Sequence, residues 1–393
     1  MKKSIIVLGL CTPLILSAQD NLVKSLEKNA SDSSKAKFIF TETIGLANTP
    51  VKNQASSGTC WSYSTNSFLE SEMVKAGKEP VELSQIFSAR NVYNDKAENY
   101  IKMHGAITLG DGGACHDVIN MYAKYGAMPQ QLYTGLNYGF KKNKFAEMQS
   151  VLAAMLQAYV KNPNGRLSPN WKEAYNAVMD TYLGKVPQSF AWKGKTYTPK
   201  TFAKEVVGLN PKDYVELSSF TDKPYYKKTI LMVPDNWSLD QIYNVKMADI
   251  TAIIDNALKN GYTVAWATDV SEKYFSWKNG VAYVPEKEYD DMSEEEQKAM
   301  FDGPKPERAI TPEMRQEAFD NYTTTDDHGM HIVGLAKDQK GREYYVVKNS
   351  WGDKNDYKGY MYVTKAYVQY KTTAFLLNKK AIPASLRNEM NIQ

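Results

Sequence analysis

The 393-residue sequence is poor in the side chains that most often carry chemistry, with only three cysteines and four histidines. So few cysteines exclude a small fold stapled by disulfides. The net charge of +4 is too small to indicate nucleic-acid or membrane binding by itself. After the N-terminus, no apolar run is long enough for a transmembrane helix. The hydrophobic fraction of 43% instead predicts a globular protein with a full-sized core.

The N-terminus has the pattern of a secretory signal peptide. Lys2 and Lys3 precede the apolar run Ile5–Leu16, and small residues follow up to Ala18. A lipoprotein signal ending at Cys11 fits less well, because the apolar run continues past that residue. We therefore expect cleavage after Ala18 and an exported, soluble protein that is periplasmic or extracellular.

Local periodicity predicts most of the secondary structure. Residues 143–210 are expected to be mostly helical, and Ser293 with Glu296 to form a capping box. The expected helices are Trp61–Ala76, Ser84–Asn94, His116–Tyr125, Ala146–Val160, Trp171–Leu183 and Met247–Asn260. The expected strands are Phe38–Thr41, Ile230–Val233, Thr263–Ala267, Val281–Val284, His331–Leu335, Tyr344–Lys348, Tyr360–Thr364 and Thr373–Leu377.

Cys60 is the first candidate for a chemical role. It lies at the start of the helix expected over Trp61–Ala76, and Thr59 is the expected N-cap. Because a helix N-terminus favours negative charge, the position predicts a thiol that ionises readily. The alternative is a buried structural cysteine. In an exported protein Cys60 could also pair with Cys115, although we expect both to be free in the active protein.

A thiolate nucleophile needs a base, and the search among histidines is short. His328 is the best candidate, because a glycine beside it leaves room for the ring and a strand follows. His331 fits a structural role within that strand. His104 and His116 could form a metal site with Cys115, but the spacing of these residues is poor for ligands, so no metal or other cofactor is expected. The four histidines are His104, His116, His328 and His331.

Three further residues could form one catalytic site with Cys60 and His328. The side-chain oxygen of Asn349 could accept a hydrogen bond from the imidazole of His328 and fix its tautomer. Trp351 could cover that hydrogen bond. Gln54 precedes Cys60 by six residues, and its amide could donate to an oxyanion together with the Cys60 backbone N–H.

These blocks resemble the signature segments of papain-like cysteine peptidases, and most closely the bleomycin hydrolase and aminopeptidase C branch. The His-Gly-Met form of the histidine block supports this branch. The blocks are Gln54–Trp61, Asp111–Gly113, Lys124–Gly126, His328–Met330 and Asn349–Gly352.

The resemblance implies an α+β, papain-like two-lobed fold, with a helical lobe carrying the cysteine and a β-barrel-like lobe carrying the histidine and asparagine. It implies that Cys60 is the nucleophile, His328 the general acid/base, Asn349 the residue that orients it, and Gln54 the oxyanion donor. Gly112, Gly113 and Trp351 would line the peptide substrate. The expected reaction is peptide-bond hydrolysis through a thioester.

His328 follows Cys60 by 268 residues, more than in simple papain-type enzymes, and the surplus matches the large helical insertion of this branch. The expected segments are therefore a signal peptide (1–18), an N-terminal segment (19–43), a helical lobe (44–140), a mainly helical insertion (141–243), a β-rich lobe (244–378) and a C-terminal tail (379–393).

The resemblance also implies an aminopeptidase and a homo-hexameric ring. In the family a C-terminal arm enters the cleft, and the characteristic ending of that arm is absent here. An endopeptidase with an open cleft is therefore an alternative to the aminopeptidase. A second alternative is a non-catalytic ring that binds peptide or nucleic acid. Nucleic acid is the less favoured ligand, because the clusters of basic residues are only adjacent lysine pairs that are scattered along the sequence.

Overall fold

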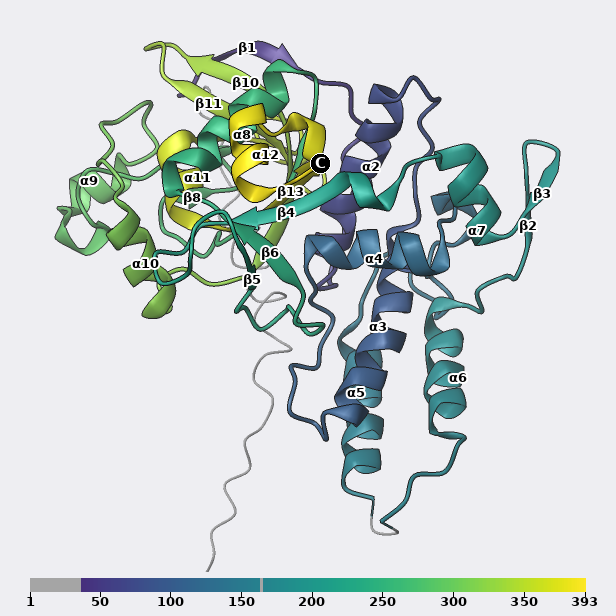
Figure 1. Ribbon diagram of the computed structural model, residues 1–393. Helices are drawn as coiled ribbons and strands as arrows, with labels where there is room; N and C mark the ends of the chain where they lie inside the picture. Colours follow the sequence, from purple (N-terminus) through teal and green to yellow (C-terminus); the bar gives the residue numbers. More distant parts are fainter. Residues whose placement is uncertain (1–36, 163–164) are drawn as a thin grey trace, which may run out of the picture.

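Helices from the first half of the chain gather on one side of the molecule (Figure 1). The computed structural model describes residues 37–162 and 165–393. Helices α3, α5 and α6 lie side by side and extend away from the sheet. Buried side chains such as Phe68 and Leu152 join these helices in one apolar core. The helices are α2 (Cys60–Lys75), α3 (Gln85–Lys102), α4 (Cys115–Tyr125), α5 (Ala146–Val160) and α6 (Trp171–Leu183).

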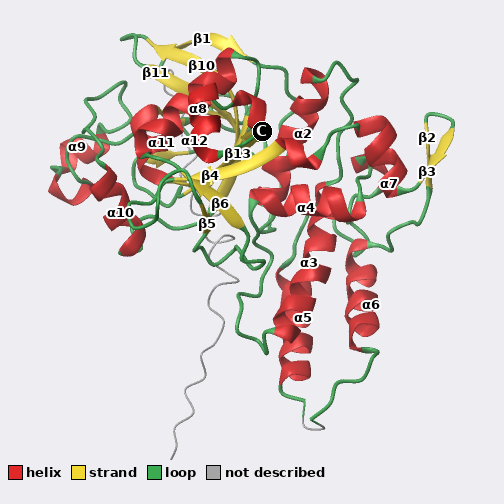
Figure 2. Cartoon of the chain, in the orientation of Figure 1, coloured by secondary structure: helices red, strands yellow, loops and turns green. Residues whose placement is uncertain are grey.

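The described strands other than β2 and β3 join in one mixed sheet, coloured yellow in Figure 2. The strand order is β5-β6-β4-β13-β7-β10-β11-β12-β9-β8, and β1 pairs with β10. The strands are β1 (Phe40–Gly45), β4 (Tyr214–Ser218), β5 (Lys228–Ile230), β6 (Gln241–Asn244), β7 (Val264–Thr268), β8 (Phe275–Ser276), β9 (Val281–Ala282), β10 (His328–Asp338), β11 (Glu343–Lys348), β12 (Tyr360–Thr364) and β13 (Thr372–Asn378).

Shorter helices and one hairpin complete the described part of the chain. The longer helix α8 (Met247–Lys259) packs on the sheet through buried isoleucines. The hairpin consists of β2 (Phe190–Trp192) and β3 (Lys195–Tyr197). The other helical segments are η2 (Gln130–Leu132), α7 (Pro199–Phe202), η3 (Ala203–Val207), η4 (Pro211–Asp213), η5 (Tyr289–Asp291), α9 (Glu294–Lys298), α10 (Pro312–Asp320), α11 (Lys365–Lys371), η6 (Lys379–Ala381) and α12 (Ala384–Met390).

Strand β10 is the central element of this sheet. It pairs with β7, β11 and β1, and α2 packs across it. Ten of its eleven residues are buried, as expected for a strand that is covered on both faces. Gly334 allows β1 to pair closely with β10, because a Cβ there would lie 2.2 Å from the Ile44 carbonyl oxygen. The first residue of β10 is His328, so the sheet holds this side chain on a rigid element.

The predicted helices are confirmed, most of them to within one or two residues, and so is the capping box at Ser293. α3 is longer than expected, and it continues to Lys102. The expectation for residues 143–210 is only partly right, because the β2–β3 hairpin lies there. Strands β4 and β5 and most of β6 also fall within 141–243, and β4 pairs with the distant strand β13. Such long-range pairing leaves no local pattern in the sequence.

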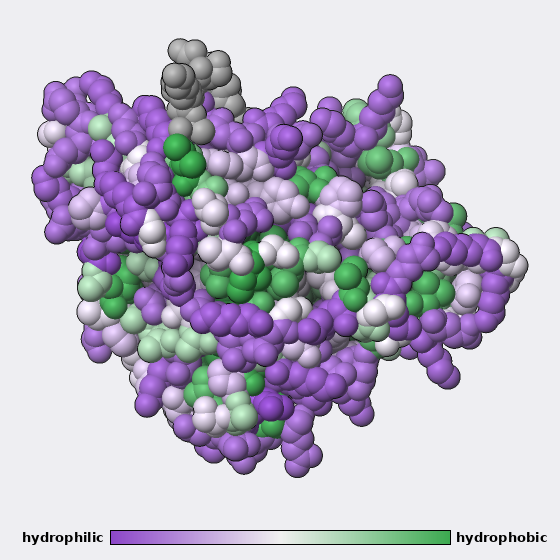
Figure 3. Space-filling view, turned by 90° about the horizontal axis from the view of Figure 1, so that it is seen from above, coloured by the Kyte–Doolittle hydropathy of each residue, from purple (hydrophilic) through white to green (hydrophobic). Residues whose placement is uncertain are grey.

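The surface is largely hydrophilic in the view of Figure 3, with separate apolar patches. No helix in the described part of the chain is both long and apolar enough to cross a membrane. The predicted signal peptide lies outside the described residues.

A substitution at Gly334 tests the close antiparallel pairing of β1 with β10. We expect Gly334→Ala to lower the free energy of unfolding by about 1–3 kcal/mol, because the new methyl group meets a backbone carbonyl that cannot rotate away. Thermal unfolding measures the effect. Gly110→Ala is the matched control, since no atom lies within 4 Å of the added Cβ. Equal stability of the two variants would contradict the packing described here.

Candidate active site

Cys60 is the first residue of α2 and is buried, with 5% of its surface exposed. Thr59 occupies the N-cap position, but the expected side-chain cap is absent. Its backbone is not extended, and its hydroxyl lies 2.6 Å from the Ser57 hydroxyl instead. The prediction that Thr59 is the N-cap residue is therefore confirmed, but its side chain makes no capping hydrogen bond. As a result, no cap side chain occupies the N–H groups of the first turn.

His328 and Asn349 lie side by side at the ends of neighbouring strands. His328 Nε2 and Asn349 Oδ1 are 2.7 Å apart, and both residues are buried. The Ser350 backbone N–H donates to the same Asn349 oxygen at 2.7 Å. This second donor holds the amide with its oxygen toward the imidazole. The pair thus has the geometry that orients a histidine ring.

The backbone after His328 lies against the first turn of α2. The N–H groups of Gly329 and Trp61 donate to the Cys60 sulfur. A Cβ at position 329 would lie 2.9 Å from the Ser64 hydroxyl and 3.2 Å from the Trp61 nitrogen. Only a glycine fits so close an approach. The two segments that carry the candidate thiol and imidazole are therefore in direct contact, although they are far apart in the sequence.

Gln54 joins this arrangement from the preceding loop. Its backbone N–H donates to the Ser350 carbonyl at 2.8 Å, and its side-chain oxygen accepts from the Ser350 hydroxyl at 2.6 Å. Its side-chain nitrogen donates to the Ser57 carbonyl at 2.7 Å. One amide hydrogen remains beyond these bonds, since a glutamine amide carries two. Gln54 is thus held firmly against the Asn349 loop.

Trp351 covers the imidazole of His328. The two ring centroids are 4.4 Å apart with planes inclined by 33°. Trp351 is 5% exposed and packs against Trp277. This cover shields the hydrogen bond between His328 and Asn349 from water, as the sequence led us to expect.

Gly112 and Gly113 lie beside the same helix start. A Cβ at Gly113 would approach a Trp61 ring carbon to 2.9 Å, and one at Gly112 would lie 2.2 Å from the Asp235 carboxylate. Buried Lys96 donates to the Gly112 carbonyl at 2.6 Å. Close packing therefore explains why both positions lack side chains, whether or not a substrate lies against them.

Burial opposes charge on both members of the candidate pair. Burial raises the pKa of the Cys60 thiol to about 12, against the lowering effect of its backbone donors. Burial also lowers the pKa of His328 to about 4, although its hydrogen bond to Asn349 opposes this change. The effect of burial on Cys60 is opposite in direction to the lowering of the pKa expected at a helix N-terminus.

Two carboxylates near Cys60 were not predicted as site residues from the sequence. The negative charges of Asp235 and Asp326 add to the effect of burial in raising the pKa of Cys60. Asp326 precedes His328 by two residues, so its place in the site was readable from the sequence. Asp235 comes from the loop before β6, which only the fold brings beside Gly112.

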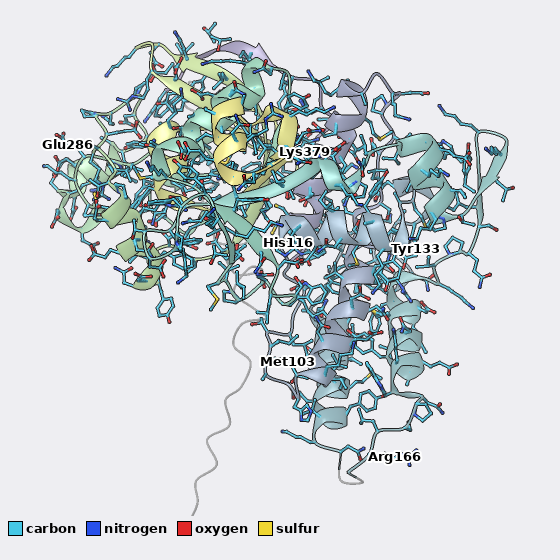
Figure 4. The ribbon with its side chains drawn as sticks, viewed as in Figure 1. Met103, His116, Tyr133, Arg166, Glu286 and Lys379 are labelled. Carbon is cyan, nitrogen blue, oxygen red and sulfur yellow. The ribbon has the colours of Figure 1, made fainter. Side chains whose placement is uncertain are left out.

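The remaining histidines and Cys115 have structural surroundings. His116 on α4 forms an ion pair with Glu216 of β4, and Figure 4 labels it on the side of α4 that faces the sheet. Burial opposes the charge on His116, but Glu216 raises its pKa to about 10. Cys115 and Cys60 are separate free thiols, both buried. Among residues 37–162 and 165–393, no cluster of three or more histidine, cysteine or acidic side chains could hold a metal ion.

Comparisons with known proteins define the class of this fold and site. The model of the Peptidase C1-like family matches residues 94–393. The chain is 24% identical over 411 residues to aminopeptidase C of Streptococcus thermophilus, with 93% of this chain and 87% of that protein covered. It is 23% identical over 400 residues to bleomycin hydrolase of Mus musculus, with 88% and 84% covered.

A solved structure of PepW from Lactobacillus rhamnosis has the same fold. The TM-score is 0.71 at 21% identity, and the match covers 95% of this chain and 91% of that one. The fold is papain-like, and the protein is a cysteine-type peptidase. The chain belongs to the Peptidase C1-like family.

Removing the charge of Asp235 tests the electrostatics of the thiol. We expect Asp235→Asn to lower the pKa of Cys60, because one of the two negative charges that oppose the thiolate is lost. The pH dependence of Cys60 alkylation by iodoacetamide, read by peptide mass mapping, reports this change. Asp222→Asn, an exposed carboxylate paired with Lys223, is the control. An unchanged profile in Asp235→Asn would show that its charge does not reach the sulfur.

Proposed function

We propose that this protein hydrolyses peptide bonds through a thioester on Cys60. Neutral His328 accepts the thiol proton as the sulfur attacks the substrate carbonyl carbon. The imidazolium then protonates the leaving amine, and the carbon–nitrogen bond breaks. Water attacks the thioester with His328 again as base, which releases the acid and restores the thiol. The observation that carries the proposal is the contact of the Gly329 N–H with the Cys60 sulfur, beside the His328–Asn349 pair.

The directions of these two pKa changes are compatible with this chemistry. A neutral imidazole is the form that can accept a proton, and burial keeps His328 in that form. Asn349 then stabilises the imidazolium as it forms, because its amide oxygen accepts the Nε2 hydrogen. The Cys60 backbone N–H and the remaining Gln54 amide hydrogen are the proposed donors to the tetrahedral oxyanion.

We further propose that the enzyme prefers substrates with a free amino terminus. The relatives named aminopeptidase C support this preference. The charge of Asp235 near the nucleophile supports it as well, since a substrate ammonium group would offset that charge. Burial raises the pKa of Asp326 to about 8, so that carboxyl contributes less charge near neutral pH. A bound ammonium group would also favour ionisation of Cys60, which links substrate binding to activation of the thiol.

An endopeptidase with an open cleft is the second candidate. Asn378, at the end of β13, donates to Glu72 at 2.8 Å, and Glu72 lies twelve residues along α2 from Cys60, or about 18 Å. The following helix α12 packs into the core of the sheet through Met390. The described tail is thus anchored near the end of α2 opposite Cys60, an arrangement that leaves it away from the nucleophile.

Export is also part of the proposal. It rests on the basic start, the apolar run and the small residues that end at Ala18.

Substitutions in the proposed triad should have graded effects. We expect Cys60→Ala to abolish hydrolysis, and His328→Ala to lower kcat about 10²–10⁴-fold through loss of general acid–base catalysis. Asn349→Ala should cost less, about 10- to 100-fold, because the base remains and only its hydrogen bond is lost. Steady-state hydrolysis of a fluorogenic peptide measures these effects, and circular dichroism checks that each variant is folded. Turnover retained by folded Cys60→Ala would contradict the mechanism.

Two substrates that differ only at the amine distinguish an aminopeptidase from an endopeptidase. We expect a fluorogenic aminoacyl amide with a free amine to be hydrolysed, and the same compound with an acetylated amine to be resistant. The acetyl group removes the positive charge of the substrate, which would otherwise offset the charge of Asp235. Comparable kcat/KM for the two compounds would favour the endopeptidase.

A further inference from the structure

A surface cavity lies beside Trp351, the residue that covers the imidazole of His328. Its volume is about 610 Å³, and small-ligand sites typically measure about 300–1,000 Å³. The cavity is therefore large enough to hold part of a peptide next to the proposed triad. Its walls come from residues 51–53, Lys142, residues 277–278 and residues 351–355.

The cavity has a fixed place relative to the triad. Trp351 and Trp277 form a buried part of its wall, and their ring centroids lie 5.4 Å apart. Asn53 and Trp351 form a β-bridge, and the Gly352 backbone N–H donates to the Lys52 carbonyl at 3.1 Å. The same two segments of chain carry the proposed oxyanion donor and the residue that orients the histidine, so the cavity and the site share one framework.

Positive charge prevails on the wall of the cavity. One of its four lysines is already paired, since Lys52 Nζ lies 3.3 Å from Glu70 Oε1 and 3.5 Å from Glu82 Oε2. One carboxylate, Asp353, also lines the cavity, and it forms no ion pair with another described residue. Within the described part of the chain, no carboxylate pairs with the remaining three lysines, Lys142, Lys278 and Lys354.

These three lysines are available to an anionic ligand. Lys142 and Lys354 are exposed, and Lys278 is half-buried. A lysine ammonium group is a point charge on a flexible four-carbon stem, so several of them can converge on one anion. Hydrogen bonds between an ammonium group and a carboxylate are also stronger than those between neutral groups. The wall therefore favours a carboxylate.

We propose that this cavity binds a carboxylate on the part of the peptide substrate that departs as the amine. In the proposed mechanism His328 protonates that amine, so the departing part lies on the side of the imidazole, where Trp351 borders the cavity. Two or three extended residues span about 7–11 Å, which carries a carboxylate from the scissile bond into the cavity. The carboxylate is the carboxy terminus of a short peptide or an acidic side chain. This specificity rests on the proposed function, whereas the affinity of the cavity for a carboxylate does not.

Matched peptides test the preference. Trialanine is compared with its carboxy-terminal amide, and amidated Ala-Ala-Glu with amidated Ala-Ala-Gln. We expect the acidic member of a pair to have a kcat/KM about 3- to 10-fold higher, mainly through KM, because the contact is remote from the reacting bond. A preference in the first pair identifies the carboxy terminus and one in the second pair an acidic side chain; either result supports the proposal. Equal kcat/KM within both pairs would overturn it.

Charge variants test which residues cause the preference. We expect the double variant Lys278→Gln with Lys354→Gln to bring the ratio of kcat/KM for acid and amide toward one. Asp353→Asn should raise that ratio, because it removes the opposing charge. Lys185→Gln, at an exposed position just after α6, is the control for net charge and should keep the ratio. Thermal unfolding checks that the variants fold. A folded double variant with the wild-type ratio would overturn the assignment to this cavity.

Binding to Cys60→Ala separates the cavity from the chemistry. Calorimetric titration of this variant with trialanine and with its amide measures affinity without turnover, and we expect the acid to bind about 3- to 10-fold more tightly. Tighter binding of the acid, together with no hydrolysis by the unaltered enzyme, would support the cavity and contradict the proposed mechanism. Equal affinity for the acid and the amide in both peptide pairs would overturn the cavity as a carboxylate site.

Discussion

The arrangement of the candidate active site depends on one backbone contact, in which Gly329 lies against the first turn of α2. A residue larger than glycine would push β10 away from the helix, since a Cβ there meets the Ser64 hydroxyl and the Trp61 nitrogen. The contact brings the Gly329 N–H group to the Cys60 sulfur, and His328 directly precedes Gly329 in the chain. The sheet supports the arrangement, because β10 is paired on both sides and begins at the histidine.

The electrostatics of the site follow from burial. Desolvation opposes a charge on either Cys60 or His328. The charge of Asp235 opposes the thiolate further. In the proposed function, a substrate ammonium group would offset that charge and favour ionisation of Cys60. Specificity for a free amine and activation of the nucleophile would then have one physical cause.

Local patterns in the sequence predicted the helices closely, and the motif residues Gln54, His328 and Asn349 proved to be neighbours in space. The features that the sequence did not predict have a common cause, which is that the residues involved lie far apart in the sequence. The pairing of β4 with β13, the position of Asp235 over Gly112 and the cost of burying Cys60 all depend on residues brought together only by folding. Thr59 is the N-cap residue as predicted, but its side chain makes no capping hydrogen bond, because its backbone is not in the extended conformation typical of capping residues.

Peptide mapping of the acyl-enzyme tests the central claim most directly. The enzyme is mixed with an excess of an aminoacyl ester that carries a free amine, quenched in acid during turnover, and analysed by mass spectrometry. The account predicts that the acyl group is found on Cys60 and that no adduct forms in His328→Ala over the same time. An acyl group on another residue, or rapid turnover with no adduct on Cys60, would contradict it.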